Sequence, residues 1–341
     1  MRPVSVFAAV IAAALIALAV PAQAQTTLTL SSWLPPSHAT TRALVDWAKE
    51  VEKASNGRIR HTLLAKGVSA PAGTYDAVRD GLADVSWNLE GYTPGRFFLT
   101  RVVEFPFLGE TSEITSVAYW RIHERYLAKA QEHKGLRVIG VFTHGPGGIF
   151  TTKKPIRSVA DFQGMKFRIG GGMITDLAAQ LGINVLLKPA SESFEILTTG
   201  IADGSLSSTE GIAAFKLDKV IRYYTRVPGG LYNTSFAVVM NPAAYERLSA
   251  QDKAVIDASS GEKLSRLFGK YWTESDAVGI QAMKTSNVEF IDANEAFVGA
   301  IRAQLKGLEA SWFEAAKSRG VDGPRVLQDL RDEIRKVSAG R

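Results

Sequence analysis

The 341-residue sequence contains no cysteine. Disulfide bonds, thiol catalysis, zinc sites built on cysteine and lipid attachment through an N-terminal cysteine are therefore excluded. The sequence also lacks the G-x-S-x-G, H-E-x-x-H and P-loop patterns of common hydrolase, metalloprotease and nucleotide sites. Its five histidines show no paired spacing. We therefore expect no catalytic activity, no metal and no cofactor.

Only the first residues form a long apolar run. Arg2 precedes an apolar stretch over residues 4–20, and Pro21 and the small-residue triplet 22–24 (AQA) follow. A membrane anchor is the alternative, but about 16 apolar residues are short for the roughly 20 that span a bilayer. The order of basic, apolar and small residues is typical of a cleaved signal peptide. We expect cleavage near Ala24 and a periplasmic protein.

Neither sign of charge dominates, because the net charge of +6 falls only to +5 when Arg2 leaves with the signal peptide. The basic residues are scattered and form no stripe with interleaved aromatic residues. We therefore expect no nucleic-acid partner. A mature chain of about 317 residues is too long for one ordinary core, so two lobes are expected.

Strand and helix patterns alternate along the chain, which is typical of an α/β protein. The first block has strand patterns at 26–33, 58–66 and 84–89 and helix patterns at about 40–54 and 74–82. The second has strand patterns at 165–169, at 184–187 and from 203, and helix patterns at about 172–181 and 191–199. Residues 81–86 (GLADVS) and 200–205 (GIADGS) match closely, each ending a helix with Gly and starting a strand with Asp. The two blocks predict two lobes built on one plan.

A nearly uninterrupted helical pattern follows from about residue 250 to 284. Its apolar stripe contains Leu264, Leu267, Phe268, Tyr271 and Trp272. Because this pattern is longer than an ordinary domain helix, we expect one long helix that packs on both lobes. A strand at 288–291 and two amphipathic helices then close the chain.

Residues 168–172 (RIGGG) follow a strand pattern and open a helix pattern. They do not make a dinucleotide site, because the third glycine of that fingerprint is missing. Free backbone N–H groups at a helix start favour an anion. The paired donors of the Arg168 guanidinium match a carboxylate. The alternative for Arg168 is an ion pair between the lobes.

Several segments together resemble the DctP-type solute-binding proteins of tripartite ATP-independent periplasmic (TRAP) transporters. The central matches are 161–168 (DFQGMKFR) and 197–204 (LTTGIADG). The supporting matches are 81–84, 95–97, 105–107, 182–184, Pro189 and 194–195. The resemblance implies a two-lobed periplasmic-binding-protein fold that closes over its ligand and delivers it to a membrane permease. It also implies a bidentate salt bridge between Arg168 and the ligand carboxylate.

Two departures from the family pattern bear on the ligand. Gly147 stands where the family often has a second arginine, and Ser207 replaces the usual asparagine. One arginine with hydroxyl donors indicates a small organic monocarboxylate rather than a dicarboxylate or sialic acid. The expected lobes are 25–147 plus about 236–280 and 148–235 plus about 281–341, with hinge glycines in 145–148 and 229–231.

The remaining ligand-binding residues are expected beyond the carboxyl ends of the strands. Trp33, Trp87 and Tyr232 are expected to wall the ligand, although either tryptophan has a place in the core as its alternative. An aromatic or branched 2-oxo or 2-hydroxy acid would fit such a wall. The predicted ligand-binding residues are Trp33, His38, Trp87, Glu90, Arg168, Gly170, Ser207, Ser208, Thr209, Tyr232 and Asn233.

Two other classes of protein stay open on the sequence alone. An ABC-type binding protein would share export and two lobes, but should lack the K-x-R signature at 166–168. A secreted enzyme would need a nucleophile or an acid–base pair, and none is recognisable.

Overall fold

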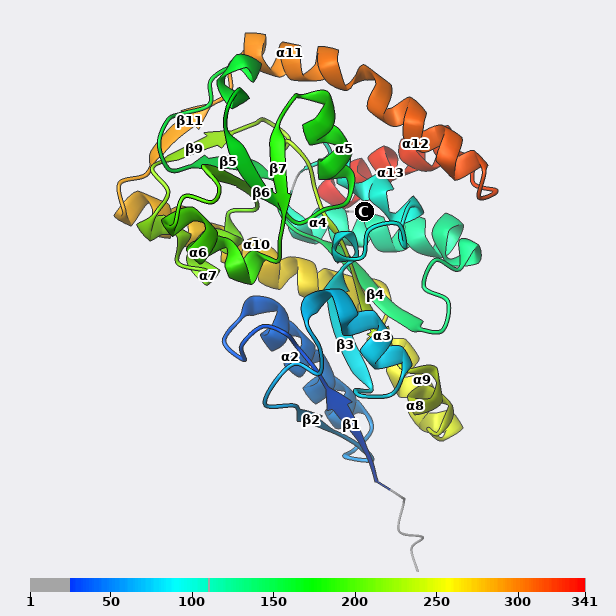
Figure 1. Cartoon of the computed structure of the whole chain (residues 1–341). Helices are drawn as coiled ribbons and strands as arrows, with labels where there is room; N and C mark the ends of the chain where they lie inside the picture. The colour runs from blue at the N-terminus through cyan, green and yellow to red at the C-terminus, as the bar shows by residue number, and fades with distance from the viewer. Residues whose placement is uncertain (1–24, 110, 341) are drawn as a thin grey trace, which may run out of the picture.

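The computed structural model describes residues 25–109 and 111–340, so the signal peptide predicted at 1–24 lies outside the described residues. The described chain folds around two mixed β-sheets (Figure 1). The first sheet has the order β2 (Ile59–Leu63), β1 (Thr26–Leu30), β3 (Val85–Leu89), β10 (Ser235–Met240) and β4 (Arg137–Thr143). The second has the order β11 (Glu289–Asp292), β9 (Tyr223–Arg226), β5 (Gly148–Thr151), β8 (Gly204–Ser207), β6 (Lys166–Ile169) and β7 (Asn184–Leu187). We call the part around each sheet the first and the second lobe.

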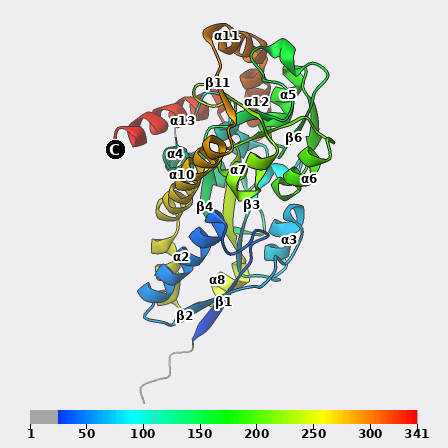
Figure 2. The same ribbon diagram turned by 90° about the vertical axis from the view of Figure 1, so that its left-hand side faces the viewer.

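The helices cover these sheets and connect them (Figures 1 and 2). Those of the first half are α2 (Ala39–Ala54), α3 (Thr74–Arg79), α4 (Ser112–Ile122), α5 (Met173–Gln180), α6 (Ser193–Thr198) and α7 (Glu210–Ala214). Those of the second half are α8 (Pro242–Glu246), α9 (Ala250–Ser259), α10 (Glu262–Thr285), α11 (Glu295–Gln304), α12 (Leu308–Lys317) and α13 (Gly323–Ser338). None of the helices in the described ranges is both long and apolar enough to cross a bilayer.

The two sheets contain the same local unit. Strand β1 lies between its parallel neighbours β2 and β3, just as β6 lies between its parallel neighbours β7 and β8. The matched joints also agree in detail, because Gly81 and Gly200 both have positive φ angles, of 79° and 73°. The Asp84 carboxylate accepts the backbone N–H of Thr29, and the Asp203 carboxylate accepts that of Lys166. The repeated unit predicted from the sequence is therefore present.

Two direct strand-to-strand crossings join the lobes, from β4 to β5 and from β9 to β10, and the chain passes between the lobes a third time through α10, on its way from β10 to β11. The two direct crossings run side by side, since Gly147 donates to the carbonyl of Tyr232 and Leu231 donates to the carbonyl of Gly147, both at 2.9 Å. The glycines that we predicted as hinges lie on these crossings, and Gly229 and Gly230 have positive φ angles. Their role in a hinge stays a prediction.

The prediction of one helix over 250–284 is wrong. The helix is interrupted between α9 and α10 at Ser260 and Gly261. Gly261 has a positive φ of 70°, which does not fit a continuous helix. The 24-residue α10 still contacts α2 and β4 in the first lobe and α7 in the second. At Gly279 it touches the carbonyl of Thr209, where a side chain would collide. The bridging role therefore belongs to α10 alone.

The chain ends in three helices, α11, α12 and α13, so the prediction of two is also wrong. The turn at Gly320, with a φ of 74°, separates α12 from α13. Helix α13 runs back to pack on α4, as Figure 2 shows.

Candidate functional site

A cavity of about 50 Å³ lies between the two lobes. This volume is on the order of a few water molecules, so the lining residues of the two lobes lie close together. The first lobe, the crossings and α10 contribute Trp33, Leu34, His38, Trp87, Leu89, Tyr92, His144, Tyr232, Thr234, Phe236 and Trp272. The second lobe contributes Arg168, Gly170, Ala190, Ser207, Ser208, Glu210, Gly211 and Phe215.

One side of the cavity is a continuous series of aromatic rings, which we call the aromatic wall. The ring centroids are 5.9 Å apart for Tyr92–Trp33, 5.2 Å for Trp33–Trp87, 6.1 Å for Trp87–Phe236, 5.1 Å for Phe236–Trp272, 6.2 Å for Trp272–His144 and 5.1 Å for His144–Tyr232. Such separations are those of favourable ring pairs. Its centre forms because β3 and β10 are adjacent strands, so Trp87 and Phe236 meet, and Trp33 follows the neighbouring strand β1. A flat apolar ligand would contact several of these rings.

Buried polar atoms without partners gather around the same cavity. The indole N–H groups of Trp33, Trp87 and Trp272 and the Nε2 atom of His144 have no hydrogen-bond partner among the described residues. Buried polar groups are normally satisfied. With the Nε2 atom of His38, which has none either, five such atoms belong to residues that line one cavity, and they favour a polar group of a ligand as the missing partner.

Arg168 is the cation of the cavity. It lies on β6 with only 4% of its surface exposed. Its Nε atom donates to the carbonyl of Lys188 at 2.8 Å, and Nη2 lies 3.4 Å from the hydroxyl of Tyr92. No carboxylate within the described ranges pairs with Arg168, so the alternative of an interlobe ion pair is not formed. A buried charge without a counter-charge is costly, and an anionic ligand would supply one.

The position of the family's second arginine is filled by an aromatic ring. A side chain at Gly147 would collide with the ring of Tyr232, which lies directly on this glycine. Burial raises the pKa of Tyr232 well above its usual value, so the phenol stays neutral. The Arg168 guanidinium is therefore the one cationic anchor that the cavity-lining residues offer besides histidine.

Glu210, an acidic residue of the second lobe, faces His38 of the first lobe beside the cavity. Nε2 of His38, from the first lobe, lies 2.8 Å from the Oε1 atom of Glu210 in the second lobe, although the ring N–H is not well aligned with it. Both side chains are 4% exposed. The pair therefore links the two lobes beside the cavity.

Two further buried groups have shifted pKa values. Burial lowers the pKa of His144 to about 4, so its ring is neutral at neutral pH. Burial raises the pKa of Asp276, on α10, to about 7, although Thr209 and the backbone N–H of Glu210 donate to its carboxylate and act in the opposite direction. Asp276 holds the start of α7, and with it Glu210, in place.

Eight of the predicted ligand-binding residues line the cavity. They are Trp33, His38, Trp87, Arg168, Gly170, Ser207, Ser208 and Tyr232. Whether they contact a ligand stays a prediction. Trp87 is 1% exposed and packs on Phe142 as well, so it belongs to the core and to the wall at once.

The other three predicted residues, Glu90, Thr209 and Asn233, lie outside the cavity lining. Burial opposes the ionisation of Glu90, but the hydrogen bond from His133, at 2.7 Å, lowers its pKa overall and fixes it away from the cavity. Thr209 donates to Asp276. The amide of Asn233, with its nitrogen turned toward the acceptors, donates to the carbonyl of His144 at 2.6 Å. All three therefore have structural partners.

The sequence interpretation missed several lining residues. Glu210 lies at a strand end that the sequence indicated, but we expected hydroxyl groups rather than a carboxylate to act there. His144, Phe236 and Trp272 had no local signal, because a crossing, β10 and α10 bring them to the cavity from distant parts of the sequence.

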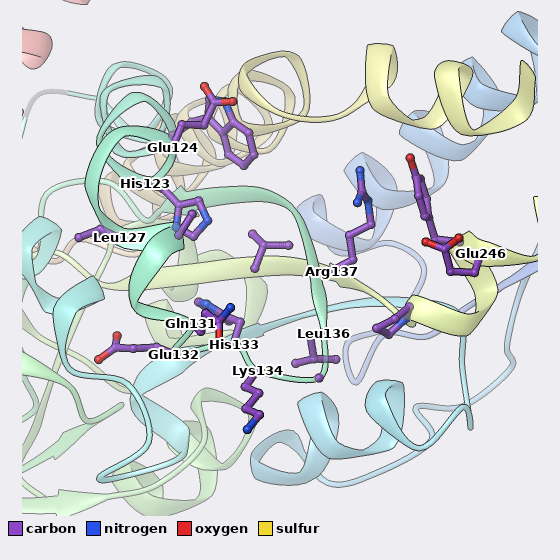
Figure 3. Close-up of a pocket in the computed structure, with 16 residues that line it drawn as sticks. His123, Glu124, Leu127, Gln131, Glu132, His133, Lys134, Leu136, Arg137 and Glu246 are labelled. Carbon is purple, nitrogen blue, oxygen red and sulfur yellow. The ribbon is translucent and has the colours of Figure 1, made fainter. Parts of the chain in front are cut away.

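Larger hollows occur elsewhere on the described surface. One of about 500 Å³ lies between the segment after α4 and the β4–α8 region, with His123 and Glu124 on one side and Arg137 and Glu246 on the other (Figure 3). It shares no lining residue with the interlobe cavity. No group of three or more His, Asp or Glu residues in the described chain is arranged to hold a metal.

The comparisons with known proteins give the family of this chain. A model of bacterial extracellular solute-binding protein family 7 matches residues 30–315. The chain is 46% identical to a TRAP periplasmic solute-binding protein from Bordetella bronchiseptica, whose crystal structure holds (R)- and (S)-mandelate; the match covers 92% of this chain and 99% of that one, with a TM-score of 0.89. A TRAP solute-binding protein from Rhodoferax ferrireducens, with co-purified benzoate, is 28% identical over the same shares, with a TM-score of 0.86. The outer membrane transporter protein TsaT of Comamonas testosteroni is 29% identical over 94% of this chain and 95% of its own length.

This chain therefore belongs to the family of TRAP periplasmic solute-binding proteins. The predicted two-lobed fold is confirmed. The family and its structural neighbours serve transport and are not enzymes, which decides against the secreted enzyme. The TRAP assignment likewise decides against an ABC-type binding protein.

Proposed function

We propose that this chain binds a small aromatic monocarboxylate in the cavity between its lobes and delivers it to the permease of a TRAP transporter. The observation that carries the proposal is the buried guanidinium of Arg168, which has no counter-charge among the described residues and shares a cavity with the aromatic wall. A guanidinium matches a carboxylate with paired hydrogen bonds. The wall offers the ring of the ligand large contact areas.

Two further facts support a single carboxylate and an aromatic remainder. The ring of Tyr232 occupies the space beside Gly147, so a second arginine has no room there. The similar proteins of known structure hold mandelate and benzoate, each with one ring and one carboxylate. An aromatic 2-hydroxy or 2-oxo acid satisfies both the wall and the single anchor better than a branched aliphatic acid.

The place of action follows from the same family. We propose a mature protein that is cleaved near Ala24, moves in the periplasm and meets the membrane permease subunits with the ligand enclosed. The two lobes would comprise residues 25–147 with about 236–280, and 148–235 with about 281–341. The two crossings would then act as hinges between them.

A thermal-shift screen tests this proposal. Benzoate, mandelate and phenylpyruvate are compared with succinate and malate, each over a range of concentrations. A ligand at 100 times its dissociation constant should stabilise the folded protein by about 2.7 kcal/mol. We expect the aromatic monocarboxylates to raise the melting temperature. If only the dicarboxylates do so, the single-anchor proposal is wrong.

A further inference from the structure

Glu210 is a buried carboxylate that the proposed carboxylate anchor does not use. It is the first residue of α7 and lines the cavity with 4% of its surface exposed. Its side chain has one polar partner among the described residues, His38. It is also the one acidic side chain among the residues that line the cavity. Because a carboxylate can accept about four hydrogen bonds, most of its capacity is unused.

The hydrogen bonds of His38 determine which of its ring nitrogens carries the proton and which lies near Glu210. The Nδ1 atom of His38 caps α2, since it accepts the backbone N–H of Thr40 at 3.3 Å and lies 2.9 Å from the Thr40 hydroxyl. An Nδ1 atom that accepts a hydrogen bond carries no proton, so the neutral ring has its proton on Nε2. The Nε2 atom lies 2.8 Å from the Oε1 atom of Glu210, although its N–H is not aligned for a hydrogen bond. His38 therefore lies against one oxygen of the carboxylate, and the second oxygen has no donor among the described residues.

We propose that Glu210, positioned by His38, accepts a hydrogen bond from a hydroxyl group of the ligand. The protein would then select hydroxylated aromatic monocarboxylates, with Arg168 binding the carboxylate and Glu210 the hydroxyl. This inference rests on the proposed function, because it needs the ligand to lie in the same cavity.

The chemistry of the cavity favours a hydroxyl over the other groups that Glu210 would meet. A second carboxylate would lie beside a like charge in a dry site and be repelled. An ammonium group carries three donors and a charge to desolvate, whereas Glu210 offers it a single free oxygen. A hydroxyl has one donor, which that oxygen satisfies.

A series of phenyl acids tests the inference on the unmodified protein. Calorimetry compares phenylacetate with mandelate, 3-hydroxyphenylacetate and 2-phenylglycine, which add a 2-hydroxyl, a ring hydroxyl and a 2-ammonium group. At least one hydroxylated acid should bind on the order of ten to one hundred times more tightly than phenylacetate, as expected for one hydrogen bond to a charged acceptor. Equal affinities, or tightest binding of 2-phenylglycine, would overturn the inference.

Glu210→Gln then assigns the effect to this residue. The variant should lose about tenfold of the hydroxyl preference, because a neutral amide oxygen is the weaker acceptor, while phenylacetate keeps its affinity or gains some. Glu195→Gln, the same change on the exposed face of α6, should behave like the wild type. A preference that survives Glu210→Gln in a protein with an unchanged melting temperature contradicts the role of Glu210.

The outcome separates this inference from the proposed function. If phenylacetate binds in an Arg168-dependent manner but no hydroxyl preference exists, only the role of Glu210 falls. If none of the four acids binds the wild type, the proposed function falls with it.

Discussion

The two lobes contain the same local unit but contribute unlike chemistry to the cavity. Trp33 follows β1 and Trp87 lies on β3, whereas Arg168 and Ser207 lie on the equivalent strands β6 and β8 of the second lobe. The first lobe therefore presents rings where the second presents a cation and hydroxyl groups. One plan thus positions side chains at equivalent strand ends, and the residue types alone decide what each half binds.

This division has a consequence for binding. A ring contact without an anchor gives little specificity, and an exposed arginine binds a carboxylate weakly in water. The His38–Glu210 contact and the hydrogen bond from the backbone N–H of Ala190 to the hydroxyl of Tyr92, at 2.9 Å, join the two lobes beside the cavity. We expect tight binding only when both halves enclose the ligand.

The largest effect should come from removing the charge of the second lobe. Arg168→Ala should weaken the binding of benzoate or mandelate by about 2 to 5 kcal/mol, because the ligand carboxylate is left buried without a partner. Arg168→Lys should restore only part of this, since an ammonium is a point charge without the paired donors. Lys166→Ala, on an exposed position of the same strand, is the control and should bind normally. Wild-type affinity of Arg168→Ala in calorimetry would remove the anchor assignment.

The second effect concerns the partly buried Asp276 behind the second-lobe half of the cavity. Its pKa is raised to about 7 by burial, from an unperturbed value of 3.8. The folded state therefore binds more protons than the unfolded state between these pH values, so this group makes stability fall as the pH rises from about 4 to about 7. The full effect is about 2 to 4 kcal/mol.

Asp276→Asn isolates this group. The variant should match the wild type near pH 4 and become the more stable of the two near pH 7.5, as measured by melting temperature. The buried His144, with its pKa lowered to about 4, acts in the opposite direction below pH 6.5, but equally in both proteins. A difference in melting temperature that is constant with pH would show that Asp276 titrates normally.

The smallest effect should come from the first lobe. Trp33→Leu should weaken benzoate binding by about 1 kcal/mol, because a favourable ring pair is lost while the site stays apolar. Trp33 suits this test better than Trp87, since it is half-buried and the change disturbs the core less. A small aliphatic acid such as 2-oxobutanoate should bind both proteins alike. Equal losses for both ligands would mean that Trp33 supports the fold rather than the ring.

The sequence predicted most of the elements and eight of the residues that line the cavity. Hydrophobic periodicity located β1, α2 and β3, and the Gly–Asp joints indicated the repeat, because these signals are local. Arg168 was found because a strand, a charge and a helix start lie within a few residues of one another.

The rest of the site depends on contacts between distant segments. Trp272 reaches the cavity from α10, which is far in the sequence from Trp33 and Trp87. Glu90 was expected to face the ligand from a strand end, but its carboxylate is hydrogen-bonded to His133 and lies outside the cavity lining. Residue spacing in a single sequence does not predict such contacts between distant segments.

Small-angle scattering with and without mandelate tests whether the two unlike halves close over the ligand. The mandelate concentration should be one that calorimetry shows to saturate the protein. We predict a smaller radius of gyration with mandelate, because the crossings near Gly147 and Gly230 would bend and bring the aromatic wall against Arg168. Arg168→Ala at the same concentration should show no change. An unchanged radius of gyration in the saturated wild type would mean that the cavity is already formed without ligand, and it would contradict the two-half account.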